Sequence, residues 1–200
     1  MSSKKKIVVL VSGSGTNLQA IIDAVKNSRL THVEIAAVIS NKKNAFALER
    51  AKNADIEAMF INPKQFTNNI DYDKKLIEMI GNYKADLIVL AGYMKILTEN
   101  FVNAFPNKII NIHPALLPDF GGKGMYGKNV HEAVLKSGVK ESGCTVHFVT
   151  TEVDAGPIIA QRKISVIPGD TVDSLSKRIL VEEHTLLVEA IEKVLFKVEA

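Results

Sequence analysis

The chain has 200 residues, of which 46% are hydrophobic and 24% are charged, and its formal net charge is +3. This length suits one well-buried domain, so a single domain over residues 1–200 is predicted. The small and dispersed charge gives no basis for a nucleic-acid partner, and the lone cysteine, Cys144, excludes an internal disulfide and suits a reducing compartment.

Two features of membrane and secreted proteins are missing from the sequence. No apolar run approaches the about 18–20 residues that a membrane span requires. The N-terminal residues Met1–Lys6 lack the apolar core of a signal peptide. The expected location is therefore cytoplasmic, with no membrane partner.

A glycine-containing turn separates the first predicted strand from the first predicted helix. Residues Ile7–Val11 are a continuous apolar run, typical of a strand buried in a parallel sheet. The turn Ser12–Asn17 follows, and apolar residues then recur at helical spacing from Leu18 to Val25. Free N–H groups at such a helix N-terminus favour a phosphate. The turn predicts a small phosphate site, and a tight turn that binds nothing is the alternative.

Two other phosphate-binding motifs are excluded at this turn. A dinucleotide-binding turn needs a third glycine where this chain has Leu18. The second strand also ends in Ser40 and Asn41, without an acid for a ribose. A Walker loop needs Gly-Lys-Ser or Gly-Lys-Thr, and neither is present.

Strands and helices alternate through the first half of the chain. The further expected strands are 33–39, 56–61 and 87–90, and the further expected helices are 45–54, 72–80 and 101–105. This succession predicts an α/β fold, a Rossmann-like doubly wound and mostly parallel sheet. The segment 91–97 mixes a glycine with apolar residues, which either line the pocket of a flat ligand or belong to the core.

The pattern changes after residue 118. Four glycines in Asp119–Gly127 indicate a surface loop, and His131 then opens a helix that Gly138 ends, with local capping as the favoured role of His131. Strands are expected at 144–149 and 158–166, and the short loop between them predicts an antiparallel pair near the C-terminal part of the chain. A final helix carries a buried stripe at Leu175, Ile179, Leu186 and Ile191.

Asn111 and His113 come at the end of a buried strand. Side chains alternate along a strand, so these two point to the same side while Ile112 points into the packing. Pro114 ends the strand because it cannot donate to a sheet. Ligands of open α/β sheets bind at the carboxyl ends of strands. The pair is therefore a candidate site, and closing a turn is the alternative.

Asp154 lies among turn-forming residues and is either a turn aspartate or a third member of this site. A carboxylate beside His113 would raise the pKa of the imidazole above about 6.5. Asn111 and a protonated His113 could then donate to an oxygen that gains charge during acyl transfer, while Asp154 helps to move a proton. Cys144 is expected to be a core residue, and no metal-ligand cluster such as H-E-x-x-H is present.

Four stretches carry a resemblance to a known family, in the order Val9–Ile22, Leu90–Leu97, Asn111–Pro118 and the loop ending at Pro157. Together they closely resemble the phosphoribosylglycinamide formyltransferase family of purine biosynthesis, over nearly the whole chain. The resemblance implies transfer of a formyl group from 10-formyltetrahydrofolate, a co-substrate, to the amine of 5-phosphoribosylglycinamide. It implies no metal.

The resemblance also implies residue roles. Asn111, His113 and Asp154 match the catalytic trio of the family. The binding positions are, for the substrate phosphate, Gly15, Thr16 and Asn17; for the glycinamide end, Glu183; and for the folate, Asn69, Met94, Lys95, Ile96, Leu97 and Asn111. From the sequence alone, Glu183 belongs only to a solvated helix face.

This chain departs from the family pattern at four places. Lys95 and Asn69 stand where many relatives have arginine, and neither reproduces the planar fork of a guanidinium. Ala155 replaces the first glycine of an Asp-Gly-Gly turn, whose second glycine is kept as Gly156. The loop Gly121–Gly127 is longer than in shorter relatives. Weaker ligand contacts and a stiffer folate loop are the expected consequences.

Other functions remain as alternatives. Formyltetrahydrofolate deformylase uses the same trio to pass the formyl group to water, but its relatives carry an additional N-terminal domain and lack the turn Ser12–Asn17. Methionyl-tRNA formyltransferase adds a C-terminal domain that binds tRNA. A non-catalytic nucleotide- or folate-binding module would not need an amide, an imidazole and a carboxylate together.

Overall fold

The computed structural model describes residues 3–196. These residues divide into two compact units, with the boundary between Ile110 and Asn111. The strands are β1 (Lys5–Val11), β2 (Val33–Ser40), β3 (Ala58–Phe60), β4 (Leu87–Leu90), β5 (Ile109–His113), β6 (Glu141–Phe148) and β7 (Ile158–Ser165). The helices are α1 (Thr16–Lys26), α2 (Phe46–Lys52), the 3-10 turn η1 (Pro63–Gln65), α3 (Asn69–Tyr83), α4 (Glu99–Ala104), α5 (Lys128–Ser137) and α6 (Val172–Phe196).

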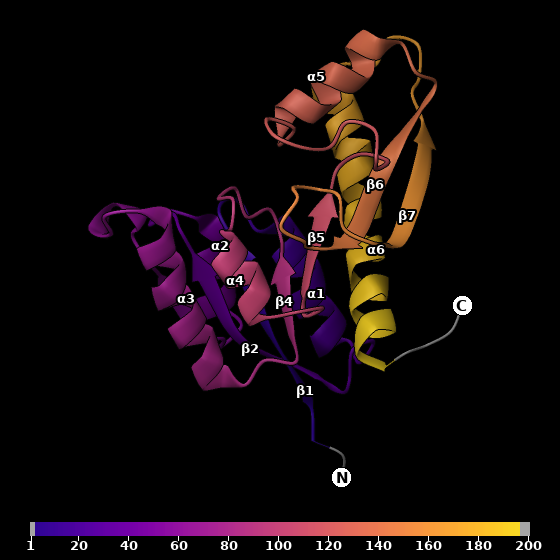
Figure 1. The fold of residues 1–200 in the computed structure, drawn as a ribbon. Helices are drawn as coiled ribbons and strands as arrows, with labels where there is room; N and C mark the ends of the chain where they lie inside the picture. Colours follow the sequence, from indigo (N-terminus) through magenta and orange to yellow (C-terminus); the bar gives the residue numbers. More distant parts are fainter. Residues whose placement is uncertain (1–2, 197–200) are drawn as a thin grey trace. The chain divides into compact units, whose positions relative to one another are not determined.

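The first unit contains a parallel sheet with the strand order β3-β2-β1-β4. The strand β1 pairs with β2 on one side and with β4 on the other, and its last five residues, Ile7–Val11, are all inaccessible to solvent. A strand in this position is buried on both faces, which explains its uninterrupted apolar run. Figure 1 shows the helices of this unit beside its strands.

The second unit contains the antiparallel pair β6 and β7, with Cys144 opposite Arg162. Helix α6 packs against this pair, as Figure 1 shows, and α5 packs against α6. The predicted stripe of α6 is confirmed, since Leu175, Ile179, Leu186 and Ile191 are all buried. The predicted α/β class, with mostly parallel strands and an antiparallel pair in the C-terminal part, is confirmed as well.

Several predicted boundaries are shifted. β3 is shorter than the predicted strand 56–61, and β6 begins at Glu141 rather than at residue 144. Helix α5 begins at Lys128, three residues before His131, and ends as predicted at Gly138, whose φ of 71° favours glycine. The prediction that His131 opens this helix is therefore wrong.

Candidate active site

The strand β5 delivers Asn111 and His113 to one side of the second unit. It ends at His113, as predicted from Pro114, and Ile112 is buried between the two polar residues. The side chain of Asn111 is half-buried, whereas His113 is only 3% exposed. An imidazole with so little contact with water depends on its protein partners for its hydrogen bonds.

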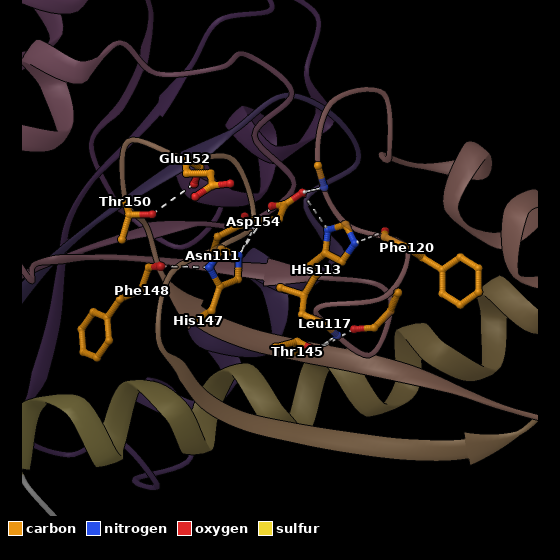
Figure 2. A network of polar contacts seen from close by, with 12 residues as sticks. Asn111, His113, Leu117, Phe120, Thr145, His147, Phe148, Thr150, Glu152 and Asp154 are labelled. Atoms are coloured by element: carbon orange, nitrogen blue, oxygen red, sulfur yellow. Dashed lines mark hydrogen bonds and ion pairs between the residues drawn. The ribbon is translucent and has the colours of Figure 1, made fainter.

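Asp154 lies beside His113, which supports the site rather than a simple turn. Its Oδ2 is 3.7 Å from His113 Nδ1 and accepts a hydrogen bond of 3.0 Å from the backbone N–H of Gly122. The backbone of Asp154 is left-handed, with φ of 57°. Two residues later, a Cβ at Gly156 would lie 1.8 Å from the carbonyl oxygen of Phe148, so only glycine fits there. The local backbone thus holds the carboxylate against the imidazole (Figure 2).

The protonation of His113 differs from the prediction. Burial lowers the pKa of its imidazole below the ordinary 6.5, because the loss of hydration outweighs the opposing effects of Asp154 and of the hydrogen bond to Phe120. The predicted rise in this pKa, and with it a protonated His113 near neutral pH, is therefore wrong. The predicted proximity to Asp154 is present, but the desolvation of the nearly enclosed ring outweighs its effect on the pKa.

The hydrogen bonds of His113 identify its tautomer. Nε2 lies 2.8 Å from the carbonyl oxygen of Phe120, which can only accept, so Nε2 carries the proton. In the neutral ring, Nδ1 then has a lone pair and faces the carboxylate of Asp154 (Figure 2). Burial opposes ionisation of Asp154, but the side chain of His147, the charge that His113 can carry and the Gly122 N–H lower the pKa of this carboxyl below 3.8. The Gly122 N–H is the donor that remains when both rings are neutral. The site therefore pairs an ionised carboxylate with a neutral imidazole.

His147 is a member of this cluster that sequence reasoning missed. Its Nε2 lies 3.2 Å from Asn111 Nδ2 and 3.6 Å from Asp154 Oδ1, and its side chain is 2% exposed. A signal was present in the sequence, because Thr145 and His147 are polar residues at alternate positions of the otherwise apolar run Cys144–Val149. Such alternation places both on one face of β6, toward β5 and the turn after it.

The loop after β5 contacts two of the predicted catalytic residues. Phe120 supplies the carbonyl that accepts from His113, and Gly122 supplies the N–H that donates to Asp154. A Cβ at Gly121, between them, would lie 2.6 Å from Leu117 Cδ2 and 3.2 Å from Asp154 Cβ. The glycines of this loop therefore permit a close approach to the site.

His131 is buried in helix α5, and the predicted local capping is wrong. The residue is 4% exposed and lies one turn inside the helix, with no hydrogen-bond partner for Nδ1. Burial and the proximity of His113 both lower the pKa of its imidazole. His131 is therefore a second neutral imidazole near His113.

The predicted phosphate turn lies in the first unit, at the start of α1. Gly15 has φ of 72°, and a Cβ there would lie 2.5 Å from Ala47 Cβ, so α2 packs directly on the turn. Arg50 holds the same turn through a 2.8 Å hydrogen bond from Nε to the carbonyl oxygen of Ser14. Thr16 is the first residue of the helix, and Asn17 is buried. Among the residues that the structure describes, no side chain caps the N-terminus of this helix through a hydrogen bond.

Ser12 connects this turn to the predicted folate segment, a link that the sequence did not reveal. Its Oγ donates to Asn41 Oδ1 at 2.6 Å and accepts from the backbone N–H of Met94 at 2.8 Å. Met94 and Ile96 are 52% and 57% exposed, so the core interpretation fails for these two side chains. Exposed apolar residues next to a strand end are consistent with a surface for a flat ligand.

Asn69 and Lys95, two of the four departures from the family pattern, contact each other within the first unit. Lys95 Nζ donates to Asn69 Oδ1 and lies 5.0 Å from the centre of the Tyr72 ring. Leu97, the last residue of the segment, is half-buried.

Glu183 and Cys144 are both buried in the second unit. Glu183 is 8% exposed on α6, so the expectation of a solvated helix face is wrong. Cys144 is a core residue, as predicted, and burial together with the charges of Glu183 and Glu182 raises the pKa of its thiol to about 12. A thiol with this pKa is not a nucleophile at neutral pH.

Within residues 3–196, no three His, Cys, Asp or Glu side chains form a group that could hold a metal ion. None of the helices described is both long and apolar enough to cross a membrane.

Comparisons with known proteins agree with these features. The family model described as "Formyl transferase" matches residues 5–191. The chain is 43% identical over 180 residues to the phosphoribosylglycinamide formyltransferase of Escherichia coli, covering 90% of this chain and 82% of that protein. It is also 43% identical over 192 residues to the trifunctional purine biosynthetic protein adenosine-3 of Bos taurus, covering 96% of this chain but only 18% of that longer protein.

A solved structure is similar over almost the same range. The crystal structure of glycinamide ribonucleotide transformylase 1 from Symbiobacterium toebii has 45% sequence identity and a TM-score of 0.90, covering 96% of this chain and 87% of that one. Identity at this level over most of both chains shows common family as well as common fold. The chain therefore belongs to the formyl transferase family, and within it to the phosphoribosylglycinamide formyltransferases.

Proposed function

We propose that this protein transfers the formyl group of 10-formyltetrahydrofolate to the amine of 5-phosphoribosylglycinamide in purine biosynthesis. Family membership supports the overall reaction. The observation that carries the residue-level proposal is the buried cluster of the second unit, in which Asp154 lies 3.7 Å from His113 and 3.6 Å from a histidine that contacts Asn111. Simple binding of a ligand would not need these three groups together.

In the proposed reaction, the amine nitrogen attacks the formyl carbon directly. A new C–N bond forms while the C=O π electrons move onto the oxygen, and the N–H donors of Asn111 and neutral His113 stabilise that oxygen. The ionised Asp154 accepts the proton that the amine loses, directly or through water. Collapse of the tetrahedral intermediate breaks the C–N bond to the folate, and the folate nitrogen takes up the proton that Asp154 accepted, directly or through water.

The neutral His113 gives this mechanism a specific requirement. Its one ring proton is donated to the Phe120 carbonyl oxygen at 2.8 Å in this structure. We propose that the formyl oxygen replaces Phe120 as the acceptor, because an oxygen that gains negative charge accepts more strongly than a neutral carbonyl. Nδ1 remains beside Asp154, whose charge stabilises any positive charge that the ring gains during the reaction.

Substrate-binding roles are proposed for the residues that match the binding positions of the family. The turn residues Gly15, Thr16 and Asn17 bind the phosphate of the ribonucleotide, supported by the N-terminus of α1. Glu183 binds the glycinamide end of this substrate. Folate contacts are proposed for Asn69, Met94, Lys95, Ile96, Leu97 and Asn111. The exposure of Met94 and Ile96 supports this last role.

The remaining proposals concern the chain as a whole. We propose that residues 1–200 act as one formyltransferase domain, because the family model spans nearly all of them. We also propose a cytoplasmic location, which suits a reduced buried thiol at Cys144. Both substrates are small molecules, and no nucleic acid or membrane partner is proposed.

The proposal is tested by following the absorbance of the folate product with and without 5-phosphoribosylglycinamide. We expect turnover only when the amine is present, and loss of turnover with retained folding in His113→Ala. Formyl release without the amine would instead indicate a hydrolase, and binding without turnover would indicate a non-catalytic module. Retained turnover in His113→Ala would remove this residue from the mechanism.

A further inference from the structure

The proposed reaction leaves one buried imidazole of the cluster without a role. His147 Nδ1 lies 2.9 Å from the carbonyl oxygen of Phe148, and its Nε2 lies 3.2 Å from Asn111 Nδ2. The same Nε2 lies 3.6 Å from Asp154 Oδ1. His147 is 1% exposed, so its ring has almost no contact with water.

The partners of His147 determine where its proton lies. A backbone carbonyl can only accept, so Nδ1 carries the proton and donates it to Phe148. In the neutral ring, Nε2 is then an acceptor. The donor that it meets is Asn111 Nδ2 at 3.2 Å, whereas Asp154 Oδ1 at 3.6 Å lies beyond hydrogen-bond distance. With the amide turned over, Asn111 Oδ1 would face the lone pair of Nε2, and the two acceptors would repel each other.

This orientation decides what Asn111 offers to a substrate. The amide nitrogen has two N–H groups, of which one is donated to His147 and the second is left for another acceptor. The amide that the proposed reaction needs as a donor is therefore held with its nitrogen in a fixed direction.

His147 is itself held rigidly by its strand. Thr145, two residues earlier on the same face of β6, donates to the carbonyl oxygen of Ala115 at 2.6 Å and accepts from the N–H of Leu117 at 3.1 Å. Gln161 on β7 adds a third hydrogen bond to the same hydroxyl at 2.9 Å. These contacts fix the face of β6 that carries His147 against the turn that follows Asn111 and His113.

We propose that His147 is a positioning residue that fixes the side-chain amide of Asn111, so that an N–H donor is presented to the oxygen of the transferred formyl group. This inference rests on the proposed function and extends it to a residue outside the trio. His147 acts through Asn111 and does not touch the substrate.

Two substitutions at His147 separate positioning from packing. His147→Phe keeps a ring but has no acceptor for Asn111, and we expect kcat to fall about 100-fold, the loss typical of one oxyanion donor. KM for 5-phosphoribosylglycinamide is expected to change less than about threefold, because the substrate contacts are intact. His147→Gln places an amide oxygen near the position of Nε2, and we expect its kcat to be at least about tenfold higher than that of His147→Phe.

A double mutant tests the path through Asn111. If His147 acts through Asn111, His147→Phe has almost no further effect on kcat in the Asn111→Ala background. Equal losses in both backgrounds would overturn the proposal, as would a His147→Phe variant with normal kcat. Val146→Ala removes core packing from the opposite face of the same strand and serves as the control, with lower stability and unchanged kcat.

A measurement without turnover keeps this inference separate from the proposed function. Long-range ¹H–¹⁵N NMR spectra distinguish the two imidazole tautomers, and the His147 signals are those missing from His147→Gln. We expect the Nδ1–H tautomer, with an Nε2 that changes shift in Asn111→Ala. An Nε2–H tautomer would overturn the positioning role even in an active enzyme. Absence of wild-type turnover would instead overturn the proposed function.

Discussion

The charge of Asp154 is the feature of the site that one substitution isolates best. Asp154→Asn keeps the size of the side chain and an oxygen that can accept from the Gly122 N–H, 3.0 Å away. Asparagine also tolerates the left-handed backbone at this position, where φ is 57°. The substitution therefore removes the negative charge between His113 and His147 and changes little else.

The expected loss of activity follows from the role of this charge. A positioned acid or base contributes about 10²–10⁴ to a rate, so we expect kcat to fall by about this factor. The stability should fall by only about 1 kcal/mol, because the bond to Gly122 changes from a charged to a neutral acceptor. Asp154→Asn should therefore lose most of its kcat and only a small part of its free energy of unfolding.

The assay compares kcat from folate-product absorbance with stability from urea unfolding. Asp173→Asn is the control in the same unit, since Asp173 lies on the surface 3.2 Å from Lys128 Nζ and is 71% exposed. A surface pair of this kind contributes about 0–1 kcal/mol, so the control should keep its full activity. A folded Asp154→Asn protein with more than about a tenth of the wild-type kcat would refute the proton-transfer role.

Three further predictions follow from burial and backbone geometry. Because burial lowers the pKa of His113 below 6.5, the unfolded chain binds more protons below that pH, and the urea midpoint should fall from pH 7.5 to 5.5. Gly15→Ala places a Cβ 2.5 Å from Ala47 Cβ at φ of 72°, and should lower stability by about 1–3 kcal/mol in the same measurement. Asn17→Ala should raise KM for the phosphorylated substrate with little change in kcat, as measured by steady-state kinetics.

Each of these predictions has a contrary outcome. A urea midpoint that rises as the pH is lowered from 7.5 to 5.5 would mean that the folded chain binds more protons than the unfolded chain. That result would be contrary to a neutral buried His113. An unchanged midpoint in Gly15→Ala would show that α2 can move away from the turn. Unchanged saturation by the phosphorylated substrate in Asn17→Ala would place the phosphate elsewhere.

Hydrophobic periodicity predicted most of the fold because the buried strands have sharp ends. The run Ile7–Val11 ends at a glycine-containing turn, and β5 ends before Pro114, so both were placed closely. Strand ends that depend on pairing with a distant strand were predicted less accurately. Residues 141–143 belong to β6 because they face Lys163–Ser165 of β7, a partnership with no local signal.

The sequence predicted which residues lie together in the candidate site better than it predicted their protonation states. The proximity of His113 and Asp154 agreed with the structure, whereas the direction of the His113 pKa did not, because burial depends on the turn that covers the ring. Glu183 was assigned to a solvated face, since its neighbours on α6 do not reveal that another element covers it. The contacts of His147 with Asn111 and of Ser12 with Met94 span 36 and 82 positions, so alternation along β6 indicates the face of His147 but not its partner.

The proposed chemistry depends on a neutral His113 beside an ionised Asp154, and a titration of His113 by NMR tests this most directly. The imidazole signal of His113 is identified by its absence in His113→Gln and followed from pH 8 to pH 5, with kcat measured over the same range. We expect the ring to titrate below pH 6.5, with no loss of kcat as the pH rises through this value. A midpoint above 6.5, with kcat falling as the ring loses its proton, would contradict the neutral imidazole and restore the ion pair.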